Sequence, residues 1–328
     1  MNILFFSTKP YEEDFFTKAN NTDAHTLIFK TETLTSQTAA LAKDYAGVCV
    51  SVRDTIDEDV LNQLKTNGCK FLALRSAGFD HVDRETAKKL GITVTYVPIY
   101  SPNSVAEHAV TLILSLNRKI VAAAERTHAY NFSLDGLLGF DMHGKTVGIL
   151  GTGKIGMLTA KILLGFGCKV IAYDVFQNQE CDKLGIPYVS LDELYAQSEI
   201  ISLHAPLTPE TEHLINTESI SKMKDGVMII NTARGKLVDT DAVINGLESG
   251  KIGYLGLDVY ENEKGIFFEN KSQEGIADEK LKKLLSLPNV LITAHQSSFT
   301  KEAKEAIAVS VLESVSEFEQ GKTPTALL

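Results

Sequence analysis

The chain has 328 residues and a formal net charge of −10, with 44% hydrophobic and 23% charged residues. This length favours two domains, the apolar fraction is enough for ordinary globular cores, and the acidic balance argues against a nucleic-acid-binding protein. The longest apolar run, near Ala109–Leu116, is far too short to span a bilayer, and the N-terminal segment has no basic leader, so we expect a cytoplasmic protein.

Residues 1–100 alternate short apolar runs with amphipathic stretches such as Asp57–Thr66 and Asp83–Leu90. This rhythm predicts a small parallel sheet with helices on both faces. No Gly-x-Gly-x-x-Gly motif occurs here, so we do not expect this unit to hold a dinucleotide. The predicted strands are Asn2–Phe6, Thr26–Phe29, Gly47–Val52, Phe71–Arg75 and Ile92–Tyr96.

Two prolines in the five residues Pro98–Pro102 predict an extended crossing between domains. A long helical pattern follows over Asn103–His128 and is rich in Ala, Leu, Ile and Val. Core packing or a contact between subunits explains such an apolar helix. We expect His108, within this pattern, to be a packed helix residue.

The most informative segment is Lys145–Asp174, which reads KTVGILGTGKIGMLTAKILLGFGCKVIAYD. An apolar strand pattern runs into Gly151-x-Gly153-x-x-Gly156, and a helical pattern and a second strand pattern follow. Gly151 permits the tight turn, Gly153 lets a pyrophosphate approach the backbone, and Gly156 lets the helix pack close to the sheet. The N–H groups at the helix N-terminus suit phosphates. We therefore predict a dinucleotide site.

Asp174 ends the second strand of this motif, where a carboxylate can accept hydrogen bonds from the adenosine ribose. A carboxylate repels the 2′-phosphate of NADP, and the following Val175 and Phe176 provide no arginine to hold one. The expected cofactor is NAD. The alternative role for Asp174 is to cap a turn.

The second unit continues the alternation of strands and helices, which predicts a doubly wound α/β fold. The last helical pattern, Thr300–Glu319, can return to the first unit. We expect two doubly wound parallel-sheet domains, a flavodoxin-like substrate domain (1–100 with 299–328) and a Rossmann NAD-binding domain (101–298). The strands predicted for the second domain are Thr146–Leu150, Lys169–Tyr173, Ile200–His204, Val227–Asn231, Gly253–Asp258 and Val290–Thr293.

Four polar residues follow predicted strands of the second domain, where ligands bind in doubly wound folds: Arg234, Asp258, Glu263 and His295. Hydride transfer to a carbonyl requires a proton donor, and His295 oriented by Glu263 suits that task. The planar guanidinium of Arg234 can grip a carboxylate through two hydrogen bonds. Together these residues predict reduction of a 2-oxo acid to a 2-hydroxy acid.

Each of these residues alone also has an ordinary structural interpretation. His295 can be a satisfied structural histidine, Arg234 a surface ion-pair partner, and Glu263 a solvated acid. His204 also ends a strand and is expected to form a wall of the cofactor groove. The cysteines (Cys49, Cys69, Cys168, Cys181) lie in apolar segments without a Cys-x-x-Cys pair, so we expect reduced thiols and no metal site.

The sequence resembles the D-isomer-specific 2-hydroxyacid dehydrogenases nearly from end to end. Within that family, its length and the segment DVYENEKGIFFENKS (258–272) are most similar to the fermentative D-lactate dehydrogenases. Phosphoglycerate dehydrogenases usually carry a proline where this chain has Glu261. The matching segments are LRSAGFDHVD (74–83), YSPNSVAEHAV (100–110), KTVGILGTGKIG (145–156), SLHAPLTPETEHLIN (202–216), IINTARGKLVD (229–239), GLDVYENE (256–263) and NVLITAHQSSFT (289–300).

The resemblance implies that Arg234 binds the substrate carboxylate, that His295 is the proton donor, and that Glu263 is its partner. Tyr100 and the backbone at Ala77 and Gly78 would approach the substrate, and Phe299 would cap it. The residues that the resemblance assigns to the NAD site, beside Gly151 and Gly153 of the motif, are Ile155, Gly156, Asp174, Ala205, Pro206, Thr211, Thr232, Ala233 and Asp258.

The activity that the resemblance implies is NAD-dependent reduction of pyruvate to D-lactate by a homodimer joined through its cofactor domain. Two alternatives stay open: a broader D-2-hydroxyacid dehydrogenase for longer 2-oxo acids, and an NAD-sensing binding protein without turnover.

Overall fold

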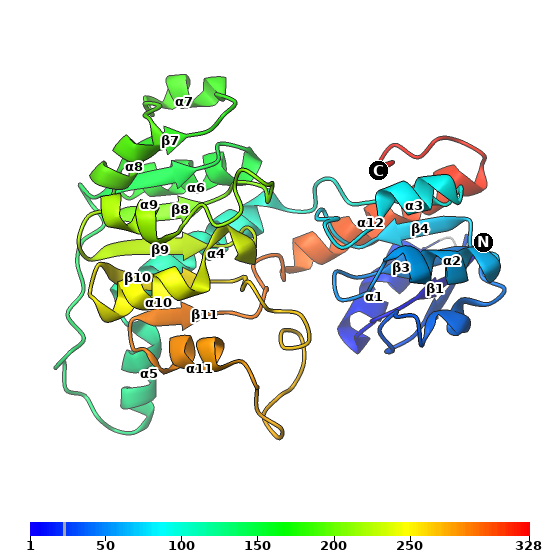
Figure 1. Ribbon diagram of the computed structural model, residues 1–328, viewed down its shortest axis with the longest axis horizontal. Coiled ribbons are helices and arrows are strands. Elements are labelled where there is room, and N and C mark those ends of the chain that lie inside the picture. The colour runs from blue at the N-terminus through cyan, green and yellow to red at the C-terminus, as the bar shows by residue number, and fades with distance from the viewer. Residues whose placement is uncertain (22–23) are drawn as a thin grey trace. The chain divides into compact units, whose positions relative to one another are not determined.

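The computed structural model describes residues 1–21 and 24–328, which form two compact units (Figure 1). Unit 1 consists of Met1–Ser101 and Phe299–Leu328, and unit 2 consists of Pro102–Ser298. Each unit is built on its own parallel sheet, which confirms the α/β fold class predicted from the alternation of strand and helix patterns.

Unit 1 contains a five-stranded sheet in the order β2-β1-β3-β4-β5, the order of flavodoxin-like folds. All its strand pairs are parallel, and all five predicted strands are present, one with the predicted bounds and four slightly shorter. The strands are β1 (Asn2–Phe5), β2 (Thr26–Phe29), β3 (Gly47–Val50), β4 (Phe71–Leu74) and β5 (Thr93–Thr95).

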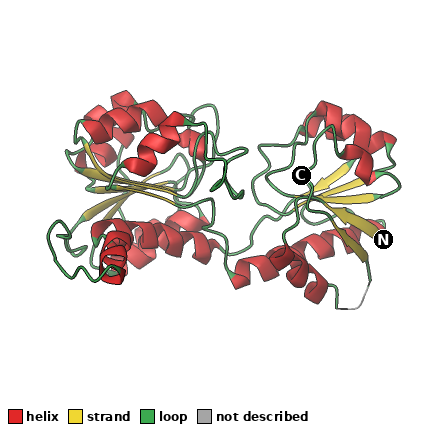
Figure 2. Cartoon of the chain, turned by 90° about the horizontal axis from the view of Figure 1, so that it is seen from below, coloured by secondary structure: helices red, strands yellow, loops and turns green. Residues whose placement is uncertain are grey.

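Helices cover both faces of this sheet (Figure 2). One apolar cluster holds residues of α2 and α3, and the other holds residues of α1 and α12. The last helix therefore completes the core of unit 1, where Ile307 and Val311 join Ile3 and Phe5. The helices are α1 (Pro10–Ala19), the 3-10 turn η1 (Ala39–Ala42), α2 (Glu58–Thr66), α3 (Arg84–Lys89) and α12 (Lys301–Glu319).

Unit 2 contains a six-stranded parallel sheet in the order β11-β10-β9-β8-β6-β7. A single parallel bridge between Ala172 and Tyr188 adds a minimal further strand beside β7. If the segment at Tyr188 is counted as the third strand of this unit, after β6 and β7, the strand order becomes 3-2-1-4-5-6, which is the order of dinucleotide-binding folds. Strand β11 adds a seventh strand at the edge next to β10. The strands are β6 (Thr146–Leu150), β7 (Lys169–Tyr173), β8 (Ile200–Leu203), β9 (Val227–Asn231), β10 (Ile252–Leu257) and β11 (Val290–Ile292).

Two apolar clusters also enclose the sheet of unit 2. One includes residues of α8, α9, α10 and α11, and the other includes residues of α4 and α6. The helices are α4 (Pro102–Asn117), α5 (Ile120–His128), α6 (Lys154–Gly165), α7 (Gln179–Leu184), α8 (Leu191–Gln197), α9 (Thr217–Lys222), the 3-10 turn η2 (Gly235–Leu237), α10 (Thr240–Glu248) and α11 (Glu279–Ser286).

The single helix predicted over Asn103–His128 is wrong, because the chain forms two helices there. Lys119 takes a left-handed conformation (φ +50°), and the buried Asn117 side chain bonds both the N–H and the C=O of Phe140. The apolar periodicity continues past this point, but α5 buries none of its residues. A contact 23 residues away in sequence therefore ends α4, which local periodicity does not reveal.

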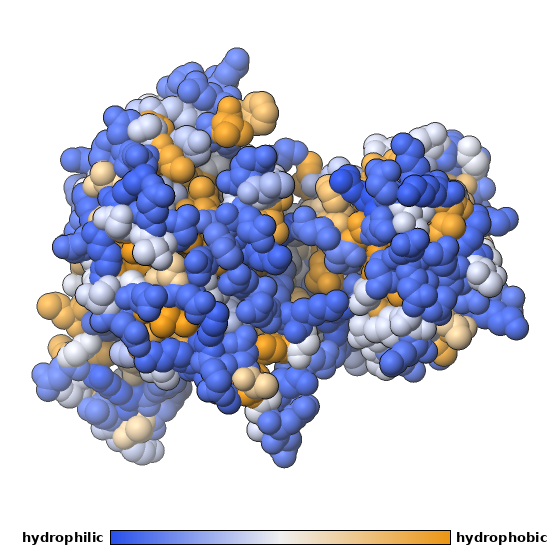
Figure 3. Space-filling view, viewed as in Figure 1, coloured by the Kyte–Doolittle hydropathy of each residue, from blue (hydrophilic) through white to orange (hydrophobic). Residues whose placement is uncertain are grey.

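No helix among the described residues is long and apolar enough to cross a membrane. The face shown in Figure 3 is mainly hydrophilic on both units, with hydrophobic side chains in small groups.

Candidate active site

The turn between β6 and α6 has the geometry that the glycine motif predicts. Gly151 has φ +97°, and a Cβ there would lie 2.7 Å from the backbone nitrogen of Ala205. A Cβ on Gly156 would overlap the carbonyl oxygen of Gly151. At Gly153, which caps α6, a Cβ would meet nothing within 4 Å. The two outer glycines thus allow tight packing, and Gly153 leaves open space at a helix N-terminus, where phosphates bind.

Asp174 lies directly after β7 and is held by this same turn. Its carboxylate accepts hydrogen bonds from the backbone N–H of Thr152 (2.6 Å) and from the Thr152 hydroxyl (3.2 Å). The hydroxyls of Thr152 and Tyr188 are 2.7 Å apart. Neither Thr152 nor Tyr188 was predicted from the sequence, although Thr152 stands inside the motif. The fixed carboxylate fits a ribose and disfavours a 2′-phosphate.

The loop after β8 forms a further part of the predicted groove. The Thr211 hydroxyl donates to the carbonyl of Pro206 (2.6 Å) and accepts the N–H of Thr208 (2.8 Å), so Thr211 fixes the loop. Burial lowers the pKa of His204 to about 4, and its Nε2 lies 2.9 Å from the Ser202 hydroxyl. His204 is therefore neutral at pH 7, which fits the prediction that it lines the cofactor groove without taking part in proton transfer.

The loop after β9 carries Thr232, Ala233 and Arg234. The buried Asn231 side chain accepts the N–H of Ala233 (3.0 Å) and donates to the carbonyl of Arg234 (2.8 Å). The Arg234 guanidinium donates to the carbonyl of Ala233 (2.8 Å). The Thr232 hydroxyl is buried and has no hydrogen-bond partner among the described residues. An unsatisfied buried hydroxyl is costly, so it is a reasonable point for a ligand to bind.

Asp258 directly follows β10 and is completely buried. Its carboxylate accepts the Thr293 hydroxyl (2.6 Å) and the N–H groups of Gln296 and Ser297 (2.8 Å each), and His108 Nε2 lies at 3.5 Å. Burial would raise the pKa of Asp258, but the hydrogen bonds from His108, Thr293 and the backbone outweigh it and lower the pKa to about 2. The ionised Asp258 thus anchors the segment around His295.

His295 and Glu263 form a close pair, with Nδ1 2.7 Å from Oε1. The other Glu263 oxygen accepts the N–H of Tyr260 (3.0 Å), and the N–H of His295 donates to the Asp258 carbonyl (2.7 Å). His295 has φ +54°, a conformation that non-glycine residues rarely adopt. Both side chains are 25% exposed. Because Nδ1 is used by Glu263, Nε2 is the nitrogen that can donate a proton to a substrate.

The predicted residues of unit 2 follow the carboxyl ends of three neighbouring strands. Arg234 follows β9, Asp258 and Glu263 follow β10, and His295 follows β11, and these strands are adjacent in the sheet. Carboxyl ends of parallel strands meet at one edge, so the arrangement concentrates an acid-paired imidazole and a guanidinium at one end of the sheet.

The predicted residues of unit 1 also follow strands. Ala77 and Gly78 come after β4, and Tyr100 comes after β5 and packs against the α1–α12 cluster. Phe299 is 53% exposed, and its ring contacts the Tyr11 ring at 4.9 Å between centroids.

Sequence reasoning missed two supporting residues. His108 on α4 is more than a packed helix residue, because its Nε2 lies 3.0 Å from the Thr293 hydroxyl and close to Asp258. Gly235 lacks a Cβ that would overlap the Tyr260 carbonyl, so the loop bearing Arg234 packs directly on the loop bearing Glu263. Both contacts join segments that are distant in sequence, so local patterns do not reveal them. The one feature of the sequence that pointed to either residue is that Gly235 directly follows Arg234.

Comparisons with known proteins agree with this geometry. Residues 110–297 match the family described as D-isomer specific 2-hydroxyacid dehydrogenase, NAD binding domain. A 2-hydroxyacid dehydrogenase homolog 1 of Schizosaccharomyces pombe is 48% identical over 330 residues, covering 100% of this chain and 99% of the relative. The D-lactate dehydrogenase of Escherichia coli is 45% identical, covering 98% of each chain.

A solved structure described as the pyruvate reductase of Chlamydomonas reinhardtii superposes with a TM-score of 0.94 at 44% identity, covering 99% of this chain and 98% of that chain. The chain therefore belongs to the D-isomer specific 2-hydroxyacid dehydrogenase family and is an NAD-dependent oxidoreductase of D-2-hydroxy acids.

Proposed function

We propose that this enzyme is a D-lactate dehydrogenase that interconverts pyruvate and D-lactate. The observation that carries the proposal is the 2.7 Å pair of His295 and Glu263, which follow β11 and β10, beside β9, the strand that leads to Arg234. The similarity to the D-lactate dehydrogenase of Escherichia coli and to a pyruvate reductase supports pyruvate as the substrate.

NADH supplies the hydride in this reaction, and the side chains of the protein handle the proton and the carboxylate. His295 protonates the carbonyl oxygen of the 2-oxo acid through Nε2, while Glu263 holds the ring through Nδ1 and stabilises the imidazolium. In the oxidation direction the neutral ring takes the hydroxyl proton back.

Arg234 binds the carboxylate of the substrate through its planar fork. Arg234→Lys keeps the charge but cannot reproduce two parallel hydrogen bonds, so we expect the KM for pyruvate to rise about tenfold to a hundredfold, the usual worth of a hydrogen bond to a charged group. Steady-state kinetics with varied pyruvate measure this. An unchanged KM would mean that another residue holds the carboxylate.

We assign substrate binding in unit 1 to Ala77, Gly78, Tyr100 and Phe299, as the family resemblance implies. Residues 1–100 with 299–328 then serve as the substrate domain and residues 101–298 as the NAD-binding domain. The bulk and exposure of Phe299 favour a substrate with a small side chain, such as the methyl group of pyruvate.

The NAD site that we propose surrounds the β6–α6 turn and the loops after β7, β8, β9 and β10. The open space at Gly153 and the unpartnered Thr232 hydroxyl support this assignment. The residues assigned to NAD are Gly151, Gly153, Ile155, Gly156, Asp174, Ala205, Pro206, Thr211, Thr232, Ala233 and Asp258.

A homodimer joined through the cofactor domain explains the apolar surface of α5 and the segment that follows it. Ile120 is 54% exposed, and Tyr130, Phe132, Leu134 and Leu138 are between 72% and 86% exposed. Clustered exposed apolar side chains of this size are characteristic of a protein contact. We propose that a second copy of the chain covers them in a cytoplasmic dimer.

A panel of 2-oxo acids with NADH and NADPH, followed by chiral analysis of the product, tests the proposed function. We expect the highest kcat/KM for pyruvate with NADH, and D-lactate as the product. A preference for longer 2-oxo acids would indicate the broader dehydrogenase, and NADH binding without oxidation would indicate a sensor.

A further inference from the structure

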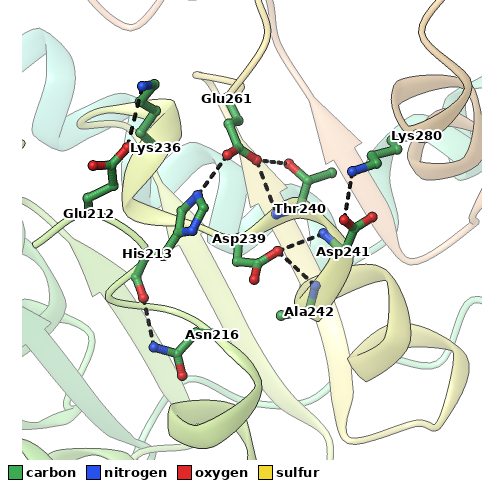
Figure 4. A network of polar contacts seen from close by, with 10 residues as sticks. All are labelled: Glu212, His213, Asn216, Lys236, Asp239, Thr240, Asp241, Ala242, Glu261 and Lys280. Carbon is green, nitrogen blue, oxygen red and sulfur yellow. Dashed lines mark hydrogen bonds and ion pairs between the residues drawn. The ribbon is translucent and has the colours of Figure 1, made fainter.

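A network of polar side chains beside the site joins the loops that follow β8, β9 and β10 (Figure 4). Glu261 Oε1 lies 2.7 Å from His213 Nε2, and Glu261 Oε2 accepts the Thr240 hydroxyl at 2.7 Å and the Thr240 N–H at 3.3 Å. We call His213, Thr240 and Glu261 the clasp. None of the three belongs to the proposed catalytic or cofactor-binding set.

Each member of the clasp is next to a functional segment. Glu261 stands two residues before Glu263, and Thr240 is the first residue of α10, directly after the loop that contains Arg234. His213 follows Thr211 on the loop after β8. The clasp therefore connects the segment of the proton-donor pair with the segment of the proposed carboxylate-binding arginine.

Backbone contacts strengthen the same connection. The N–H of His213 donates to the carbonyl of Lys236 (2.8 Å), and Ile215 exchanges hydrogen bonds with Leu237 and Asp239 (2.9 Å each). His213 has φ +51°, which costs a non-glycine residue on the order of 1–2 kcal/mol and persists only where the surroundings hold it.

Glu261 is suited to act as the centre of the clasp. Burial would raise its pKa, but the hydrogen bonds from Thr240 and His213 outweigh burial and lower it, so the side chain is ionised at neutral pH. The carboxylate also sits at the N-terminus of α10, where a negative charge is favourable. The Glu261 side chain is 20% exposed and Thr240 is 3% exposed, so the two bonds to Thr240 are shielded from water, whereas the His213 side chain is 40% exposed.

We infer that the clasp is a positioning device that holds the Arg234 loop in register with the Glu263 loop, so that the carboxylate and the carbonyl of one substrate are engaged together. This inference rests on the proposed function. The competing interpretation is an ordinary surface ion pair, which would contribute little to stability and nothing to catalysis.

The test compares variants of the clasp with a matched control on the same helix. Asp241, the next residue of α10, pairs with Lys280 at 2.7 Å (Figure 4), but its side chain is 65% exposed and the pair connects α10 with α11. The clasp variants are Glu261→Ala and Thr240→Val, which remove its bonds. Thr240→Ser keeps the hydroxyl, and Asp241→Ala is the control.

We expect Glu261→Ala and Thr240→Val to raise the KM for pyruvate about tenfold to a hundredfold, because displacements near 1 Å cost factors of this size. Thr240→Ser and Asp241→Ala should stay within about twofold of wild type. Hydrogen–deuterium exchange of the free protein should accelerate over residues 213–215 and 234–239 in the two impaired variants only.

Two results would overturn the inference: an unchanged KM in Glu261→Ala, or an equal loss in Asp241→Ala, which would indicate general destabilisation. The hydrogen exchange readout needs no substrate, and the wild-type rate with pyruvate tests the proposed function alone. Failure of the clasp and failure of the proposed function are therefore distinguishable.

Discussion

The first β–α turns of the two units differ, although both units are parallel α/β sheets. In unit 1, Ser7 and Thr8 fill the turn, and both are buried. Their N–H groups donate to the carbonyls of Glu32 and Lys30, and the Ser7 hydroxyl donates to the buried Asp54 (2.7 Å). In unit 2, the corresponding turn contains Gly153, with nothing within 4 Å of the position of a Cβ.

The difference between the two turns shows how the same α/β architecture can either exclude a phosphate or accommodate one. Where side chains fill the turn and its N–H groups are already bonded, a phosphate has no room and no donors. Where the turn is open and a carboxylate such as Asp174 follows the next strand, the same fold suits a dinucleotide. If the proposed division of labour between the units follows from these local differences, changes in the two turns should have different effects on NADH binding.

The largest expected effect lies in the chemistry of unit 2. His295→Gln removes the proposed proton donor and should lower kcat by about a hundredfold to ten-thousandfold, the usual worth of general acid catalysis. NADH binding, measured by fluorescence titration, should stay near normal. A variant with nearly wild-type kcat would remove His295 from this role.

A side chain in the open turn of unit 2 should remove the space for a phosphate, as Ser7 and Thr8 do in unit 1. Gly153→Val places a branched side chain in the free space and should weaken NADH binding about a hundredfold, the equivalent of about 3 kcal/mol of lost contacts to phosphate. Isothermal titration calorimetry measures this loss. Unaltered affinity would show that the pyrophosphate binds elsewhere.

The partly buried His204, whose backbone packs on Gly151, gives unit 2 a specific sensitivity to acid. Burial lowers its pKa from 6.5 to about 4. On acidification the unfolded chain therefore takes up the proton before the folded chain does. The contribution of His204 to the free energy of unfolding is complete above pH 6.5 and falls by about 2–3 kcal/mol as the pH approaches 4.

His204→Asn should lack this part of the pH dependence. Urea unfolding of the wild type and the variant at pH 7 and pH 4.5 measures the difference. If both proteins lost the same free energy on acidification, His204 would not be the responsible group.

The smallest effect is expected in unit 1. Ser7→Gly relieves a positive φ (+53°) and removes the hydroxyl bond to Asp54, two opposing changes of about 1 kcal/mol each. The NADH affinity should not change, because the N–H groups of this turn are already bonded within unit 1 and we propose that the cofactor binds to unit 2. A clear loss of NADH affinity would contradict the division of labour.

The strands of both sheets were predictable because buried parallel strands are continuous apolar runs between turns. The glycine turn and Asp174 were also predictable, since a local motif encodes them. The break between α4 and α5, the single-bridge strand at Tyr188 and the clasp were not, because each depends on partners distant in sequence. His213 and Glu261, for example, are 48 residues apart.

The central claim is that Arg234 and the His295–Glu263 pair act together on one 2-oxo acid. A crystal structure of the enzyme with NADH and oxamate, a stable analogue of pyruvate, tests it most directly. We predict two Arg234 hydrogen bonds to the oxamate carboxylate and His295 Nε2 about 3 Å from its amide carbonyl oxygen. An oxamate carboxylate bound by other residues, or a His295 ring turned away from that oxygen, would contradict the claim.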